Sequence, residues 1–355
     1  MSRQMVVCSP MASDSSQTPG FQPPWWLRGP HAQTIGSALM PRSPSEHRAI
    51  LRRVDLDDGD ALAVHDDIPS GWQPGGRVAI LSHGLADHHR SPLLVRLTDK
   101  LTQRGVRVFR WDMRCCGAGL TWARRPYHAG CSDDLAAVVN GVLAWCRDEA
   151  GSGGPDPDMS LFGVSLSGNV LLKYLGEAPD RVPAAVRCAV AVNPPIDLVV
   201  GCESIASRSN RIYDRHFTGM LVKHLESWWQ ARPDAVRPAG TIRPRTLRQF
   251  DDWFTAPAIG YRDAMDYYRH ASAAQFIPAI RLPTTIITSR DDPFVPFEMF
   301  AADRVAYPEC VRLQATDQGG HVGYIGRAGD DPDSRWLDWR VVEIIDPLST
   351  ESSTE

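Results

Sequence analysis

The sequence lacks the features of membrane-spanning, nucleic-acid-binding and disulfide-stabilised proteins. It contains no uninterrupted apolar stretch near the ~18 residues that a membrane-spanning helix needs. It has no basic tract, and its net charge of −4, from 38 basic and 42 acidic residues, gives no electrostatic attraction for nucleic acid. What is present is a chain of 355 residues with 43% hydrophobic content, enough to bury a large core in a single α/β domain.

The eight cysteines are scattered and form no C-x-x-C pair; only Cys115 and Cys116 are adjacent. We therefore expect reduced thiols in a reducing compartment rather than disulfides or a zinc site. Residues 1–20 are small and polar, and Met5–Cys8 is too short for the core of a signal peptide. We expect a disordered N-terminus, a cytoplasmic location and, because residues 346–355 are also polar, a disordered tail.

Short β-branched runs alternate with helical patterns along the chain. Apolar runs without strict alternation are typical of strands covered on both faces, and the intervening helices indicate crossovers of a parallel sheet. Ahead of them, Ala49–Leu56 and Ala61–Asp66 flank the turn D-D-G-D and predict an antiparallel hairpin. The predicted parallel strands are Arg77–His83, Val106–Met113, Met159–Val164, Cys188–Asn193, Thr284–Ser289 and Val311–Thr316.

Three helices have clear sequence signals. Ser132 is predicted to be the N-cap of a helix that has Asp133 and Asp134 in its first turn. Apolar residues at helical spacing predict two more helices, Leu166–Gly176 and Trp336–Ile345.

The strand predicted to end near Asn193 and the one predicted to begin at Thr284 are separated by an unusually long connection of about ninety residues. One crossover helix requires far fewer. Phe217, Leu221 and Leu225 follow helical spacing, and a second aromatic segment covers Phe250–Tyr268. We predict a single α/β domain over residues 21–345 with a mostly helical insertion at about 198–280, a lid over the carboxyl edge of the sheet.

The strongest functional signal is Met159–Asn169, which reads M-S-L-F-G-V-S-L-S-G-N. A short buried strand, a serine in a strained turn and an immediate helix form the pattern of a nucleophile elbow. The helix N-terminus directs backbone N–H groups at developing negative charge. The residues two before and two after the serine must be small, and Gly163 and Ser167 satisfy this. We predict that Ser165 is a nucleophile.

A serine hydroxyl needs a base to take its proton and a carboxylate to orient that base. In the α/β-hydrolase fold the order is serine, acid, histidine, with the last two in loops after later strands. The loop R-D-D-P-F-V-P supplies Asp292 as the predicted acid, with Asp291 expected to face solvent, and the loop D-Q-G-G-H-V-G-Y supplies His321. Asp197, at the end of N-P-P-I-D, is the alternative acid.

Stabilising an oxyanion requires backbone N–H donors. One is expected from Leu166, directly after the serine, and the other from Leu85 in the loop L-S-H-G-L-A-D-H-H-R, where Gly84 lets the backbone turn inward. We expect His83 to brace this loop rather than transfer protons. The D-H-H run at positions 87–89 has no H-x-H or H-E-x-x-H partner, so we expect a polar rim or plain surface and no metal site.

Several motifs together resemble the YheT-like α/β-hydrolases, which are related to plant embryogenesis-associated proteins and animal lipid-acting abhydrolases. The likeness extends over residues 21–345. Its most particular motifs are P-P-W-W-L-R-G-P-H-A-Q-T at Pro23–Thr34 and F-D-D-W-F-T-A-P-A-I-G-Y from Phe250. Its more widely shared motifs are H-G-L at His83–Leu85, G-V-S-L-S-G-N at Gly163–Asn169, D-D-P-F at Asp291–Phe294 and G-G-H-V-G at Gly319–Gly323.

The resemblance implies an α/β-hydrolase fold with a mostly parallel sheet, flanking helices and a helical lid. It implies a Ser165–Asp292–His321 triad acting on short-chain or lipid esters. From the mechanism, the motifs and the charge we expect no cofactor, no metal and no nucleic-acid partner. The family usually has glycine where this chain has Ser167, a difference that concerns the packing behind the nucleophile. Two alternatives stay open: an acyltransferase on the same triad, and a non-catalytic binding module of this fold.

Overall fold

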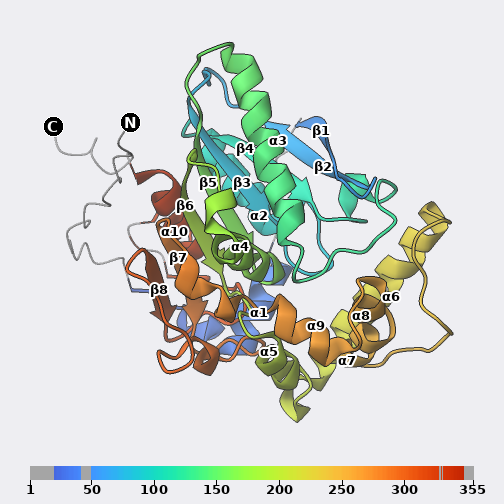
Figure 1. Ribbon diagram of the computed structural model, residues 1–355. Coiled ribbons are helices and arrows are strands. Elements are labelled where there is room, and N and C mark those ends of the chain that lie inside the picture. The colour runs from blue at the N-terminus through green and yellow to red at the C-terminus, as the bar shows by residue number, and fades with distance from the viewer. Residues whose placement is uncertain (1–19, 41–48, 328, 330, 348–355) are drawn as a thin grey trace.

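The alternating apolar runs and helices fold around one eight-stranded sheet, with strand order β1-β2-β4-β3-β5-β6-β7-β8. The computed structural model describes residues 20–40, 49–327, 329 and 331–347. β1 and β2 pair antiparallel, β2 also pairs antiparallel with β4, and the other neighbours are parallel (Figure 1). The strands are β1 Ile50–Asp55, β2 Ala61–Asp67, β3 Arg77–Ser82, β4 Arg107–Asp112, β5 Asp158–Val164, β6 Val186–Val192, β7 Thr284–Ser289 and β8 Val311–Thr316.

These strands confirm the predicted parallel runs and the leading hairpin. The predicted ends differ by no more than two residues, the largest shift being at the start of β6. β2 and β4 are buried along their whole length, as expected for strands that lie between covered faces. The predicted α/β fold class is therefore confirmed.

Helices cover both faces of the sheet. α3 (Ser132–Ala150) and α4 (Leu166–Glu177) pack on one face, in front of the strands in Figure 1. α2 (Pro92–Thr102) and α10 (Trp336–Ile345) pack together on the other face, around β3, β4, β5 and β6. The two predicted helices at 166 and 336 are confirmed.

The start of α3 differs from the prediction. Cys131, not Ser132, is at the N-cap position, and it makes no side-chain capping bond. Ser132 is the first helical residue, and its hydroxyl donates to Glu177 Oε2 at 2.6 Å while accepting from Lys173 Nζ at 3.1 Å. The Ser132 hydroxyl is therefore bonded to side chains of α4 and does not cap α3.

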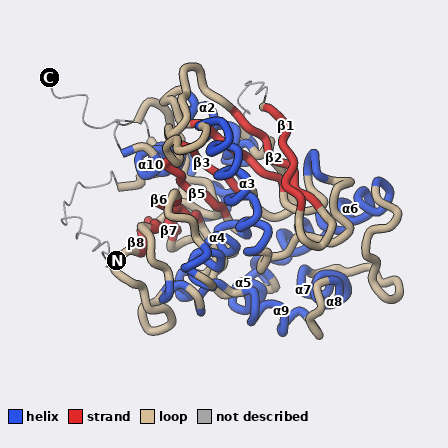
Figure 2. The backbone as a smooth tube through the Cα atoms, turned by 45° about the horizontal axis from the view of Figure 1, so that its top comes forward, coloured by secondary structure: helices blue, strands red, loops and turns tan. Residues whose placement is uncertain are grey.

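Helices also fill the connection between β6 and β7. Both views show them gathered at one end of the sheet (Figures 1 and 2). They are α5 Leu198–Ile205, α6 Arg211–Ala231, α7 Leu247–Phe250, a π-helical turn Asp251–Thr255, α8 Ala256–Ala258 and α9 Ala264–Ala271. A further helix, α1 (Pro30–Leu39), precedes the sheet, and 3-10 turns lie at Trp25–Leu27, Gly117–Gly119, Pro179–Arg181, Arg208–Asn210, Ala273–Gln275, Ile277–Ala279 and Phe297–Phe300.

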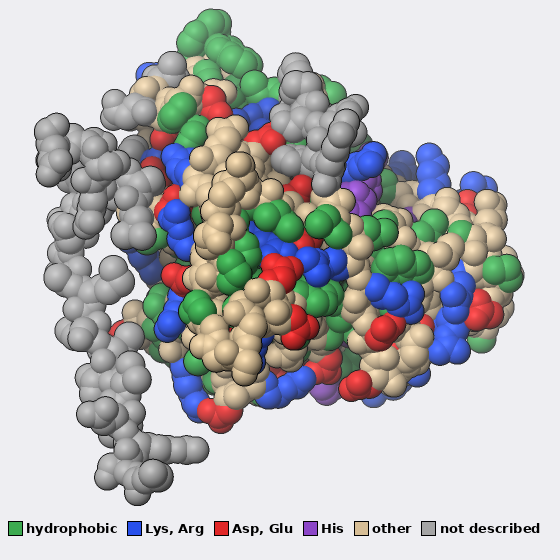
Figure 3. All heavy atoms as spheres, turned by 90° about the horizontal axis from the view of Figure 1, so that it is seen from above, with side chains coloured by type: hydrophobic (Ala, Val, Ile, Leu, Met, Phe, Trp, Pro, Cys, Tyr) green, Lys and Arg blue, Asp and Glu red, His purple; other side chains and the backbone are tan. Residues whose placement is uncertain are grey.

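The predicted disordered ends fall almost wholly outside the described residues and stay predictions. Within the described part of the chain, no helix combines the length and apolarity that a bilayer crossing requires. The seven described cysteines are free thiols. On the face shown in Figure 3, basic and acidic side chains are interspersed rather than gathered by sign.

A buried charge cluster joins the sheet to α3. Arg107 on β4 is fully buried, and its guanidinium donates to Asp66 Oδ1 at 2.8 Å and to Glu149 Oε2 at 2.5 Å. Arg52 on β1 donates to the same two carboxylates. The cluster thus links β1, β2, β4 and α3, and it leaves no charge in the cluster without an opposite partner.

Arg107→Ala should lower the free energy of unfolding by about 3 kcal/mol, because it removes a fully buried cation from the fully buried Asp66 and leaves only Arg52 beside it. The measurement is urea denaturation at pH 7. The matched control is Arg147→Ala on α3. Its ion pair with Asp156 is 56% and 44% exposed, and its loss should cost less than about 1 kcal/mol. Equal losses in the two variants would contradict this account of the cluster.

Candidate active site

The turn between β5 and α4 places Ser165 at the carboxyl edge of the sheet. Ser165 has φ 53° and ψ −120°, a left-handed backbone conformation that is strained for a residue with a Cβ. A Cβ added at Gly163 would lie 2.5 Å from the Ser167 carbonyl oxygen. Only glycine therefore fits at position 163, which explains the predicted need for a small residue there.

Ser167, the departure from the family's usual glycine, makes its own contribution to this turn. Its hydroxyl accepts the Val164 N–H at 2.8 Å and donates to the Ser82 carbonyl at 2.9 Å. These bonds tie the turn to the end of the neighbouring strand β3. The side chain is buried, so the substitution adds fixed hydrogen bonds without enlarging the turn.

The structure brings together the three predicted triad residues from the loops after β5, β7 and β8. His321 Nε2 lies 2.9 Å from Ser165 Oγ, and His321 Nδ1 lies 2.8 Å from Asp292 Oδ2. The other carboxylate oxygen of Asp292 accepts the N–H groups of Phe294 and Val295 at 2.8 and 3.0 Å. The carboxylate is thereby fixed in the orientation that faces the imidazole.

Two residues that the sequence reasoning did not identify also hold this carboxylate. Asn193 Nδ2 donates to Asp292 Oδ2 at 2.6 Å, and the Tyr324 hydroxyl donates to Asn193 Oδ1 at 3.0 Å. Asn193 directly follows β6, at the same sheet edge as the triad. Its position after a buried strand was the available signal, but nothing in the sequence indicated which side chain it would meet.

The N-terminal motif of the resemblance holds the histidine loop in place. Thr34 Oγ1 accepts the His321 N–H at 2.9 Å. Gln33 is fully buried and bonds Ile325 twice, from Nε2 to the carbonyl at 3.1 Å and from the Ile325 N–H to Oε1 at 2.8 Å. Gly320 has φ +57°, and a Cβ there would collide with the Pro30 carbonyl. The H-A-Q-T segment therefore holds the loop that carries His321 in position.

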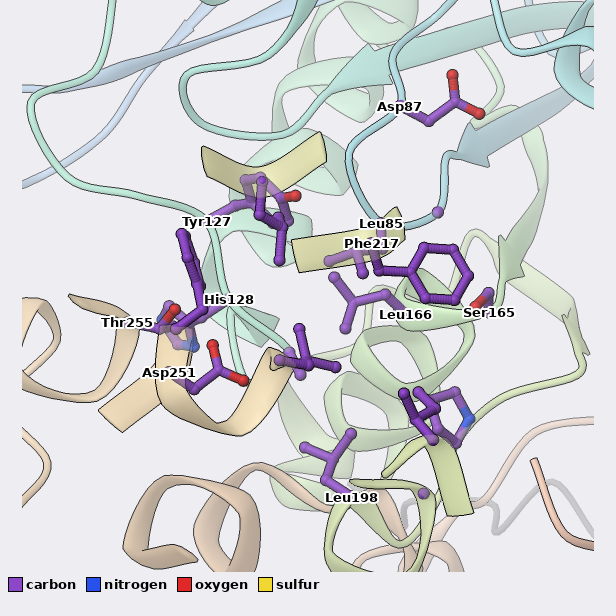
Figure 4. Close-up of a pocket in the computed structure, with 18 of the residues that line it drawn as sticks. Leu85, Asp87, Tyr127, His128, Ser165, Leu166, Leu198, Phe217, Asp251 and Thr255 are labelled. Carbon is purple, nitrogen blue, oxygen red and sulfur yellow. The ribbon is translucent and has the colours of Figure 1, made fainter. Parts of the chain in front are cut away.

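The two predicted oxyanion donors lie beside Ser165 (Figure 4). Leu166 is the first residue of α4, and Leu85 lies in the loop after β3. Among the described residues neither N–H has a hydrogen-bond acceptor. His83 is buried, lies 2.8 Å from the Gly84 carbonyl through Nδ1 and accepts the Met113 N–H at Nε2, so it braces this loop as predicted.

The prediction that Asp291 faces solvent is wrong. Its Oδ1 accepts the Gly320 N–H at 2.8 Å, and burial raises the pKa of this carboxyl above its ordinary value. Asp291 thus supports the loop that carries His321 by accepting a backbone N–H of that loop. Asp197, the alternative acid, is the N-cap of α5, where Oδ1 accepts the N–H groups of Val199 and Val200.

A mainly apolar cavity of about 330 Å³ opens beside Ser165 and His321. Its size is at the lower end of the range for small-molecule sites. Much of its wall comes from the helices between β6 and β7, including the side chains of α6 that follow helical spacing. These wall residues are Leu198, Phe217, Leu221, Leu225, Trp228, Phe250 and Phe254.

One end of the cavity is polar. Asp251, Thr255 and His128 lie across it from Ser165 (Figure 4). Asp251 is buried and accepts the Tyr268 hydroxyl at 2.6 Å. Burial raises the pKa of Asp251 to about 6, and it lowers the pKa of His128 to about 4, so the imidazole is neutral at pH 7.

Asp251→Asn should stabilise the protein at alkaline pH. The folded-state pKa of Asp251 is raised from 3.8 to about 6, so the contribution of this group to stability is full below pH 3.8 and is lost as pH rises to about 6. Asparagine can still accept the Tyr268 hydroxyl but carries no charge. The variant should gain up to ~3 kcal/mol at pH 8 and little at pH 4, as measured by urea denaturation.

The matched control is Asp252→Asn, one residue along, where the side chain is 41% exposed. This variant should show no gain that grows with pH. A pH profile of Asp251→Asn parallel to that of the unmodified protein would contradict the assignment.

Comparison with known proteins identifies the family of the chain. The sequence profile of the family described as serine aminopeptidase, S33 matches residues 73–321. The YheT protein of Escherichia coli (strain K12) is 29% identical over 94% of this chain and 95% of its own length. A monoacylglycerol lipase of Saccharomyces cerevisiae is 29% identical over 69% of this chain and 54% of its own, and a medium-chain fatty acid ethyl ester synthase/esterase of the same yeast is 24% identical over 81% and 69%.

Solved structures share the fold at low sequence identity. A 2,6-dihydroxy-pseudo-oxynicotine hydrolase superposes with a TM-score of 0.53 at 16% identity, covering 89% of this chain and 72% of that one. An esterase of Pyrococcus furiosus gives a TM-score of 0.52 at 16% identity, covering 86% and 95%. From the sheet order, the elbow and the extent of the profile match, the chain belongs to the serine aminopeptidase S33 family of α/β-hydrolases, as a YheT-like member.

Proposed function

We propose that this hydrolase is a serine esterase that cleaves carboxylic esters through an acyl-enzyme intermediate. The observation that carries the proposal is the continuous line from Ser165 Oγ through the His321 imidazole to the Asp292 carboxylate, with contacts of 2.9 and 2.8 Å. A serine hydroxyl in this arrangement has both a base for its proton and a carboxylate that fixes the base's tautomer.

In the acylation step Ser165 Oγ attacks the ester carbonyl while His321 Nε2 takes the hydroxyl proton. Asp292 keeps the other ring nitrogen protonated and stabilises the imidazolium that forms. His321 then gives its proton to the leaving alcohol as the carbon–oxygen bond breaks. The Asn193 amide and two backbone N–H groups hold Asp292 ready for this role before substrate arrives.

The negative charge of the tetrahedral intermediate falls on the former carbonyl oxygen. The Leu85 and Leu166 N–H groups are the proposed donors, because both border the cavity at Ser165 and have no acceptor of their own in the described chain. Each donor of this kind is worth on the order of 3 kcal/mol of transition-state stabilisation. Deacylation repeats the sequence with water, activated by His321, as the nucleophile.

The lining of the cavity favours the apolar chain of an acyl group over a polar group. Leucine, phenylalanine and tryptophan side chains surround it, and apolar burial contributes roughly 0.8 kcal/mol for each methylene of a bound chain. The names of the yeast relatives describe lipid esters and medium-chain ethyl esters, and we propose the same class of substrate here. The acyl-enzyme can also pass its acyl group to an alcohol, which is the acyltransferase alternative; adding ethanol to the assay separates the two outcomes.

Ser165→Ala should abolish labelling by a fluorophosphonate probe and reduce hydrolysis of p-nitrophenyl esters by about 10³-fold or more, because the attacking oxygen is removed. The matched control is Ser167→Ala, two residues along the same turn. It loses the hydrogen bonds to Val164 and Ser82 and should cost about 1–2 kcal/mol of stability but keep its labelling. Labelling retained in Ser165→Ala would exclude Ser165 as the nucleophile, and an inert but ligand-binding wild type would favour the binding module.

Asp292→Asn should lower kcat by up to ~10⁴-fold with a small change in KM, because the amide cannot hold the imidazole in the productive tautomer. Asp291→Asn tests the neighbouring carboxyl, which contacts the loop backbone and not the imidazole. It should lower activity far less. The acid would have to be reassigned if the two variants behaved alike or if the order were reversed.

A further inference from the structure

Outside the cavity, three side chains from separate segments of the chain point at one another. They are His65 on β2, His89 in the loop after β3 and Asp112 at the end of β4. One ligand atom from each lies within 4.8 Å of the other two. His65 Nε2 is 3.0 Å from Asp112 Oδ2, and His89 Nδ1 is 2.9 Å from the same oxygen.

The sheet itself builds this cluster. In the antiparallel pairing of β2 with β4, His65 lies opposite Arg110, so Asp112, two residues further on, is on the same face. Arg110 Nη1 donates to the His89 carbonyl at 2.8 Å and holds the third residue over that face. Because 47 residues separate His65 from Asp112, sequence spacing did not reveal the grouping.

The Asp112 carboxylate has hydrogen-bond donors but no cationic side chain to balance its charge. It accepts the backbone N–H of His89 at 2.7 Å and that of Ala118 at 2.9 Å. Asp112 is fully buried, and no Lys or Arg side chain of the described residues forms an ion pair with it. A buried carboxylate without a cation is costly, so the site is suited to an added positive charge.

The two imidazole rings lie face to face. Their rings stack with centroids 3.5 Å apart and planes 17° apart, a separation at which two imidazolium charges would repel strongly. His65 Nδ1 and His89 Nε2 have no hydrogen-bond partner among the described residues, so they can carry the ring protons. A bound ion would replace the protons through which His65 Nε2 and His89 Nδ1 donate to Asp112.

We propose that His65, His89 and Asp112 bind a divalent transition-metal ion, with Zn²⁺ as the best match to two imidazole nitrogens and one carboxylate oxygen. Tetrahedral Zn²⁺ with these donors places neighbouring ligand atoms roughly 3.3 Å apart. The two nitrogen–oxygen separations of 3.0 and 2.9 Å are close to this, and the two nitrogens lie within 4.8 Å of each other. The histidine side chains are 10% and 13% exposed, which leaves a route to solvent for the ion and a water ligand.

The position of the site indicates a structural role. None of its three residues borders the cavity at Ser165. His89 is four residues after Leu85, so a bound ion would fix the loop that carries this proposed oxyanion donor to β2 and β4. His88, adjacent in sequence, is exposed and does not contact Asp112.

The test uses the full chain without a polyhistidine tag, stripped with chelator and titrated with ZnCl₂ by calorimetry. One Zn²⁺ per chain is expected, with a rise in Tm of roughly 4 °C at a hundredfold excess over Kd. His89→Ala and His65→Gln should each weaken binding at least tenfold, whereas His88→Ala should bind as the wild type does. Circular dichroism and probe labelling of Ser165 establish that each variant is folded.

Absence of saturable Zn²⁺ binding to the wild type would overturn the proposal. So would equal loss of binding in His88→Ala and His89→Ala, because the ion would then be held elsewhere. Should His89→Ala fail to fold, Asp112→Asn removes the charge and keeps an acceptor for one of the two backbone N–H groups; unchanged Zn²⁺ affinity in that variant would also overturn it.

Discussion

The whole candidate site depends on one backbone conformation, the left-handed turn at Ser165 between β5 and α4. The turn is strained for serine, and it is stable only because its surroundings leave no alternative. Gly163 allows the chain to pass within contact of Ser167, and the Ser167 hydroxyl fastens the turn to β3. This backbone conformation places the Ser165 hydroxyl above the sheet edge, next to the N-terminus of α4. The same few residues therefore set both the position of the hydroxyl and the positive end of the helix dipole beside it.

The acid and the base are held by parts of the chain that have no direct contact with the hydroxyl. Asp292 is fixed by two backbone N–H groups and by Asn193, and the His321 loop is fixed by Thr34 and Gln33. A displacement of about 1 Å is enough to lower the rate of such a reaction substantially. The N-terminal motif therefore belongs to the site, although it lies almost three hundred residues from His321 in sequence.

The cavity combines two environments that serve different purposes. Apolar side chains from the helices between β6 and β7 form much of the wall of the space next to Ser165. The far end has the buried Asp251 carboxyl and the neutral His128 imidazole. An uncharged chain with a polar end group would match both environments. Burial of Asp251 makes this end the part of the cavity most sensitive to pH.

The sequence by itself determined the strands, the elbow and the order of serine, acid and histidine, because these are local patterns: apolar runs, small residues around a turn, and charged groups in loops after strands. Only the tertiary structure decided what depends on contact between distant segments. Strand register and loop packing place Asn193 behind Asp292, and Gln33 and Thr34 beneath His321. They also leave Asp291 partly buried and bring His65, His89 and Asp112 together. Which side chains meet across the sheet depends on which strands are neighbours. The order of residues along the chain contains no periodic pattern that specifies this pairing.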